Sequence, residues 1–131
     1  MTVASADRDY LDFHGKVVLI TGAATGIGRA VAVGFASRGA KIAIGDINED
    51  AARQTLDLVE RSAGDLLFVR TNVSDEGDVE QLVAATVKRF GRLDCAFNNA
   101  GIAQPAQSIA QLDASIFESG QRGIAWTAGS R

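Results

Sequence analysis

The sequence has little of what marks secreted, membrane or nucleic-acid-binding proteins. Its single cysteine, Cys95, excludes an internal disulfide and suits a reducing compartment. No run of about eighteen apolar residues occurs, so the sequence does not predict a membrane-spanning helix. Residues 1–12 contain acids and no apolar segment, which argues against a secretory signal. We therefore expect a cytoplasmic protein.

The charge balance is equally plain. The sequence has sixteen acidic and thirteen basic residues, which gives a net charge of −3, and it contains no cluster of basic residues. Such a chain lacks the electrostatic footprint of a nucleic-acid-binding protein, so we expect no nucleic-acid partner. The length of 131 residues and an apolar content of 47% suit one globular domain.

Strands and helices are expected to alternate along the chain. Four short apolar runs, at residues 16–21, 41–45, 66–69 and 93–97, are expected to form strands. The first is rich in β-branched residues, which is typical of a strand buried on both faces. The segments between the four runs have helical periodicity. The order βαβαβαβ with short connections predicts an α/β fold with a doubly wound parallel sheet of the Rossmann type.

Capping signals and apolar spacing locate the three helices. The first follows a glycine-rich turn and ends at Gly39. The second is capped by Asn48, buries Ala52, Leu56 and Val59 on one face, and ends near Gly64. The third is expected to be capped by Ser74, and its apolar stripe comprises Val79, Leu82, Val83, Thr86, Val87 and Phe90.

The turn after the first strand, Thr21 to Gly28, reads TGAATGIG. Glycines let the backbone turn tightly and approach a ligand closely, and the N–H groups of the helix that follows face that ligand. The segment therefore predicts a cradle for a pyrophosphate group. The alternative is a glycine turn that only packs a helix against a strand.

Asp46 ends the second strand, beside the end of the first in a doubly wound sheet. A carboxylate there can accept hydrogen bonds from both ribose hydroxyls of an adenosine. It would repel a 2′-phosphate, and no basic residue follows directly, so NAD is favoured over NADP. The alternative is a loop acid that supports the Asn48 cap.

The fourth strand runs into Asn98-Asn99-Ala100-Gly101. Together with the TGxxxGIG loop and Asp46, this segment resembles the classical short-chain dehydrogenases/reductases over about residues 10–117. The resemblance implies that the chain carries the N-terminal half of the family's Rossmann-type fold. Asn72-Val73 departs from the family's usual Asp-Val, although an Asn amide can still bond an adenine edge. An alternative for Asn98-Asn99 is a simple turn. The resemblance and the strand-end reasoning together give these candidate NAD-binding residues: Gly22, Thr25, Gly26, Ile27, Gly28, Asp46, Asn72, Val73, Asn99, Ala100 and Gly101.

The resemblance also implies chemistry that this chain does not complete. The family transfers a hydride between a nicotinamide and a secondary alcohol or ketone, and uses a Tyr-x-x-x-Lys and a serine downstream of NNAG. Here the single tyrosine is Tyr10 and the last lysine is Lys88. We therefore assign no catalytic residue and expect no turnover from this chain alone. A full-length parent is expected to act on a small-molecule alcohol or ketone and to form a homotetramer.

We divide the chain accordingly. Residues 1–14 are expected to form an N-terminal arm, residues 15–117 the NAD-binding Rossmann part, and residues 118–131 an atypical tail outside the family's pattern. Two other accounts stay open. One is a truncated or frame-shifted product that at most binds a dinucleotide, and the other is an adenosylmethionine-dependent methyltransferase. No metal site is predicted, Cys95 is expected in the core, and His14 is expected to be solvated.

Overall fold

The computed structural model of the chain describes residues 12–62 and 64–101. In this part the elements are strands β1 (Val17–Thr21), β2 (Lys41–Asp46), β3 (Leu66–Arg70) and β4 (Cys95–Asn98), and helices α2 (Gly26–Ala36), α3 (Glu49–Arg61) and α4 (Glu76–Phe90). Strands and helices alternate as the sequence predicts.

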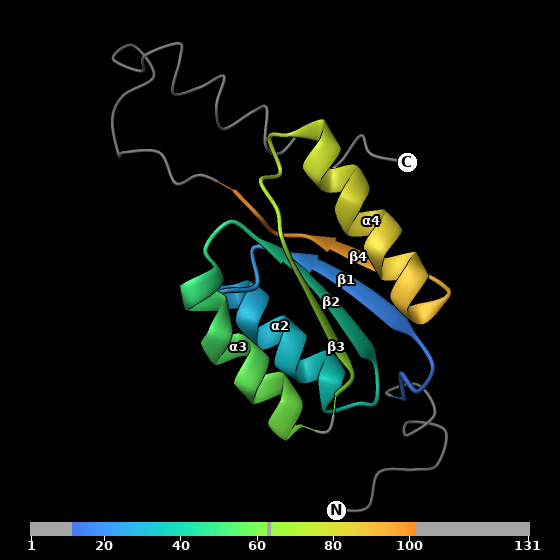
Figure 1. Cartoon of the computed structure of the whole chain (residues 1–131). Coiled ribbons are helices and arrows are strands. Elements are labelled where there is room, and N and C mark those ends of the chain that lie inside the picture. Colours follow the sequence, from blue (N-terminus) through green and yellow to red (C-terminus); the bar gives the residue numbers. More distant parts are fainter. Residues whose placement is uncertain (1–11, 63, 102–131) are drawn as a thin grey trace, which may run out of the picture.

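The four strands form one parallel sheet in the order β3-β2-β1-β4 (Figure 1). The chain reverses its direction of winding after β3, because β4 pairs with β1 on the side away from β2. The carboxyl ends of β1 and β4 therefore lie side by side at the switch point where doubly wound sheets bind ligands. The predicted Rossmann-type half-fold is confirmed.

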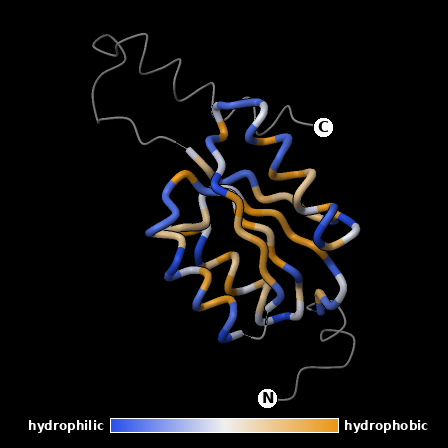
Figure 2. Tube along the Cα trace, in the orientation of Figure 1, coloured by the Kyte–Doolittle hydropathy of each residue, from blue (hydrophilic) through white to orange (hydrophobic). Residues whose placement is uncertain are grey.

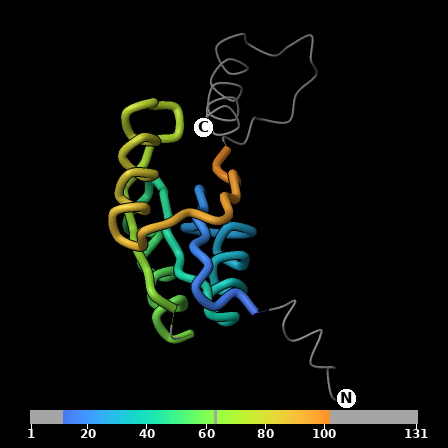
Figure 3. The backbone as a smooth tube through the Cα atoms, turned by 90° about the vertical axis from the view of Figure 1, so that its right-hand side faces the viewer, coloured from blue at the N-terminus to red at the C-terminus, as the bar shows by residue number. Residues whose placement is uncertain are grey.

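Helices cover both faces of the sheet. Val18 and Ile20 of β1 face the cluster with α2 and α3, whereas the intervening Leu19 packs with Leu82 of α4. This alternation follows from the two-residue side-chain period of a strand. Figure 2 shows the strands as the most hydrophobic part of the described chain. In Figure 3, α4 and α2 lie on opposite sides of the strands.

Helix α4 lies very close to β2, where Gly45 has no side chain. A Cβ on Gly45 would lie 2.5 Å from Leu82 Cδ2, so a larger residue here would require the Leu82 side chain to shift. The predicted α4 stripe is only partly correct. Val79, Leu82 and Thr86 are buried, but Val83 and Val87 are 37% and 44% exposed. These two valines point away from the sheet, since one helix face can touch only one layer.

The helix starts test the predicted caps. The side chain of Asn48 accepts a hydrogen bond from Ala51 N at 3.0 Å, so the predicted cap of α3 is confirmed. The predicted Ser74 cap of α4 is wrong. Asp75 is the N-cap and accepts from Asp78 N at 3.1 Å, while Ser74 N donates to Asn72 Oδ1. Ser74 is thus part of a turn with Asn72 that precedes the helix, and the N-cap lies one residue later than predicted.

Strand β4 starts later than the sequence suggests, at Cys95 in place of Leu93, and lies at the edge of the described sheet. The prediction of Cys95 as a core residue is wrong, because its thiol is exposed. A hydropathy pattern shows that a strand is apolar but does not show which of its faces a helix covers. Here α2, α3 and α4 contact β1, β2 and β3.

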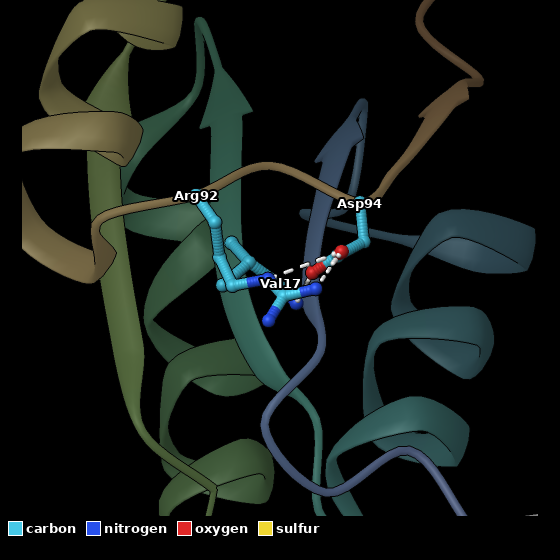
Figure 4. Close-up of polar contacts among 3 residues, drawn as sticks. All are labelled: Val17, Arg92 and Asp94. Atoms are coloured by element: carbon cyan, nitrogen blue, oxygen red, sulfur yellow. Dashed lines mark hydrogen bonds and ion pairs between the residues drawn. The ribbon is translucent and has the colours of Figure 1, made fainter.

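Asp94 fastens β4 to the beginning of β1 (Figure 4). Its Oδ2 accepts from Val17 N at 2.8 Å, and its Oδ1 accepts from Arg92 Nη2 at 2.6 Å. The Arg92 guanidinium, together with the Val17 N–H, holds the pKa of the Asp94 carboxyl below its usual range. The ionised Asp94 carboxylate therefore stabilises the attachment of β4 to β1.

Several predictions fall on residues outside the described part, namely most of the arm, Tyr10, residues 102–117 and the tail 118–131. His14 is described and is exposed, as expected. Across residues 12–62 and 64–101, no helix combines the length and apolar character needed to cross a membrane.

Candidate functional site

A cavity of about 520 Å³ opens at the carboxyl ends of the strands. It brings together residues far apart in sequence, from the β1–α2 loop to the segment after β4. Every candidate cofactor-binding residue except Gly28 lines it. Further lining residues, which sequence reasoning did not single out as site residues, are Ala24, Gly45, Ile47, Asn48, Ala51, Thr71 and Ser74.

The three glycines of the TGAATGIG loop serve different purposes. Gly22 and Gly26 have φ of +72° and +60°, which disfavour other residues. A Cβ on Gly26 would meet no atom within 4 Å, so this position borders open cavity. A Cβ on Gly28 would lie 2.4 Å from Gly22 O. Gly28 therefore lies behind the cavity wall and lets the helix pack against its own loop.

The segment after β4 is tied to the glycine loop. Thr21 Oγ1 accepts hydrogen bonds from Asn99 N at 3.2 Å and Ala100 N at 3.1 Å. Asn99 Nδ2 donates to Gly22 O at 3.1 Å. The Asn99 side chain therefore positions the loop, and Asn99, Ala100 and Gly101 all line the cavity.

Asp46 lies at the end of β2 and faces the same loop. Its Oδ2 accepts from Ala24 N at 3.0 Å, and its Oδ1 accepts from Asn48 N at 2.9 Å. It therefore supports the turn before α3, as one sequence interpretation suggests, and it also lines the cavity. A carboxylate has about four lone-pair sites, so capacity remains for two hydroxyl donors.

The start of α2 differs from the starts of the other two helices. Helices α3 and α4 each have a side-chain cap and two acids in the first turn. The N-cap of α2, Thr25, makes no side-chain cap bond, and the first turn contains no acid. The N–H groups and positive dipole end of α2 are therefore available to an anion in the cavity.

Apolar side chains also line the cavity. Ile47, directly after Asp46, is 54% exposed, and Val73 lines the same cavity. Asn72 is present as expected, but its Oδ1 accepts from Ser74 N at 3.0 Å. Ile47 was missed by sequence reasoning, and its signal is an apolar residue directly after a strand end, where a polar one is usual.

The residues that line the cavity include neither basic side chains nor a metal-binding cluster among the described residues. Among the described residues that line it there is no lysine or arginine. Within the described part of the chain, no group of three or more His, Cys, Asp or Glu side chains could hold a metal ion. The site therefore offers amide donors, one carboxylate and several apolar side chains.

A family model described as "short chain dehydrogenase" matches residues 16–120. The chain belongs to this family. An uncharacterized oxidoreductase of Thermotoga maritima is 51% identical over 92 residues, which are 70% of this chain and 36% of the relative. The L-fucose dehydrogenase of Oryctolagus cuniculus is 42% identical over 105 residues, which are 80% of this chain and 36% of the relative.

Solved structures of short-chain dehydrogenases match the fold closely. A short-chain type dehydrogenase/reductase from Mycobacterium marinum has a TM-score of 0.86 and 32% identity, with 92% of this chain and 50% of that chain covered. An NAD⁺-bound xylitol dehydrogenase has a TM-score of 0.84 and 29% identity, with 90% and 47% covered. The chain therefore spans about half the length of these structures.

Proposed function

We propose that this chain is the NAD-binding portion of an oxidoreductase that interconverts a secondary alcohol and a ketone. One observation carries the proposal. Asp46 and the acid-free, uncapped start of α2 line the same cavity, so a hydroxyl acceptor and an anion site lie together. A dinucleotide has ribose hydroxyls next to a pyrophosphate, which is the combination that these groups complement.

The residues present fit each part of the cofactor. The amides at Thr25 to Gly28 would hold the pyrophosphate, and open space at Gly26 leaves room for it. Asp46 would accept the adenosine ribose hydroxyls. Ile47 and Val73 would contact the adenine, with Asn72 at its edge, and Ala100 and Gly101 would lie toward the nicotinamide ribose. NAD, when bound, supplies the hydride chemistry.

The same geometry favours NAD over NADP. A 2′-phosphate would lie beside the Asp46 carboxylate, and no basic side chain lines the described cavity to compensate it. Two negative charges at such a short distance repel each other and weaken binding. Two structural relatives, an NAD⁺-bound xylitol dehydrogenase and a carveol dehydrogenase in complex with NAD, support a nicotinamide dinucleotide as the cofactor.

Turnover requires groups that this chain does not supply. The family's tyrosine and lysine would follow β4, but Tyr10 precedes the first strand and Lys88 lies on α4. We therefore expect the chain to bind NAD without oxidising alcohols. Substrate recognition and tetramer assembly would belong to a longer parent.

Calorimetric titration of the 131-residue chain with NAD, NADP and adenosylmethionine tests the proposal. We expect NAD to bind about tenfold or more tightly than NADP, and adenosylmethionine to show no binding. Equal or tighter binding of NADP would overturn the preference, and preferential binding of adenosylmethionine would overturn the family chemistry. A panel of secondary alcohols with NAD should give no rate above background.

A further inference from the structure

Two polar side chains hold the glycine loop from behind. Thr55 of α3 is completely buried, and its Oγ1 lies 2.7 Å from Ala23 O and 3.2 Å from Ala24 O. Arg29 of α2 donates through Nε to Thr55 Oγ1 at 3.0 Å and through Nη2 to Ala24 O. Neither residue lines the cavity.

The directions of these hydrogen bonds are fixed by chemistry. A guanidinium can only donate, so the Thr55 hydroxyl accepts from Arg29 and must direct its single proton to the loop carbonyls. Ala23 O is the nearer of the two acceptors. Arg29 supplies the second donor to Ala24 O and also reaches Ala51 O at 3.4 Å. Both carbonyls are therefore drawn toward α3.

The rigidity of the peptide unit passes this constraint to the cavity side. In a trans peptide the C=O and the following N–H point in opposite directions. Drawing Ala24 O toward α3 therefore turns Thr25 N–H away from α3, at the start of α2. The preceding N–H, that of Ala24, is held by Asp46 Oδ2 at 3.0 Å.

We propose that Thr55 and Arg29 are positioning residues for pyrophosphate binding, acting through the loop carbonyls without touching the cofactor. The inference rests on the proposed NAD site. Preorganised amides bind an anion without the cost of ordering the loop first. Removal of the Thr55 hydroxyl takes its donor from the buried Ala23 carbonyl and its acceptor from Arg29 Nε, and the loop then reorients toward water.

The test uses Thr55→Val, which keeps the shape of the side chain and removes the hydroxyl, and Thr55→Ser, which keeps the hydroxyl. Thr86→Val is the matched control, because Thr86 is also fully buried on a helix and donates to Leu82 O at 2.7 Å. Thr86 belongs to α4, on the other face of the sheet. Circular dichroism first identifies a temperature at which every variant is folded.

Binding is then measured with NAD by calorimetry and with adenosine, which lacks the pyrophosphate, by NMR titration. We expect Thr55→Val to raise the Kd for NAD about tenfold and that for adenosine less than about twofold. Thr55→Ser should bind NAD nearly as the unmodified chain does. Thr86→Val should change neither Kd, although it lowers stability.

Three results would overturn the positioning role: an unchanged Kd for NAD in Thr55→Val, an equal loss for NAD and adenosine, or the same loss in Thr86→Val. If Thr55→Val does not fold, Arg29→Lys tests the positioning role instead. Lysine keeps the positive charge but lacks the guanidinium that donates to both Thr55 Oγ1 and Ala24 O. It should weaken NAD binding several-fold and leave adenosine binding unchanged. If the unmodified chain does not bind NAD, the proposed function itself fails.

Discussion

Gly28 is the loop residue whose missing side chain is most important for folding. A Cβ there would lie 2.4 Å from Gly22 O and 2.9 Å from Ala23 Cα, both backbone atoms that cannot swing away. Gly26 is the opposite case, because a Cβ there would meet no atom within 4 Å. One glycine is thus required for packing, and the other for backbone conformation and open space.

This contrast gives a prediction. Gly28→Ala should lower the free energy of unfolding by about 2–3 kcal/mol through overpacking. Gly26→Ala should cost only about 1 kcal/mol, for its positive φ, but should weaken NAD binding because the methyl group enters the cavity. Urea unfolding and calorimetry measure the two effects. The interpretation is wrong if Gly26→Ala is the less stable variant.

Asp46 provides a second prediction at this scale. Asp46→Asn removes the charge and keeps one oxygen acceptor, so NAD binding should weaken while repulsion of a 2′-phosphate disappears. The ratio of the Kd for NADP to that for NAD should fall about tenfold. Asp57→Asn, an exposed acid on α3, makes the same change in net charge and should leave the ratio unchanged. A ratio that is unchanged in Asp46→Asn would contradict the assignment.

At the scale of elements, α2 and α3 start in different ways. Asn48 caps α3 through Ala51 N, whereas Thr25 precedes α2 without a side-chain bond. A cap stabilises the helix end, while an uncapped end keeps its amides for a ligand. The difference therefore separates a structural helix start from one that serves a site.

Alanine substitutions at these two positions test the difference. Asn48→Ala should lower the free energy of unfolding by about 1 kcal/mol, the usual contribution of a cap. Thr25→Ala should change it by only a few tenths of a kcal/mol, since no cap bond is lost. Thermal and urea unfolding of both variants provide the measurement. Equal losses would show that Thr25 also caps its helix in solution.

At the scale of the whole molecule, Asp94 joins the last described strand to the first. Its pKa is lowered by the Arg92 guanidinium and the Val17 N–H. A carboxyl whose pKa is lower in the folded than in the unfolded state stabilises the protein above the unfolded pKa of about 3.9. That contribution decreases as the pH falls toward the folded pKa.

Asp94→Asn should therefore be less stable than the unmodified chain at pH 7. Its stability should also change less between about pH 4 and pH 2, because the titrating group is absent. Urea unfolding at pH 7, 4 and 3 provides the comparison, with Asp57→Asn as the control for net charge. A pH dependence identical to that of the unmodified chain would show that Asp94 contributes nothing to acid stability.

Much of the fold and site could be predicted because the relevant signals are local. Apolar runs and glycine stops place β1 to β3 and their helices, and strand ends place Asp46 beside the TGAATGIG loop. The Ser74 cap and the buried Cys95 were wrong for one shared reason. Each depends on a neighbour that local sequence does not specify, namely the Asn72 turn in one case and the cover of β4 in the other.

The sequence by itself determined the family, the parallel α/β architecture and the candidate residues, because motif and periodicity are properties of contiguous segments. Only the tertiary structure decided that Thr55 and Arg29 hold the loop carbonyls, that Ile47 lines the cavity, and that Val83, Val87 and Cys95 are exposed. Burial and hydrogen bonding are set by packing between distant segments, which no single stretch of sequence contains.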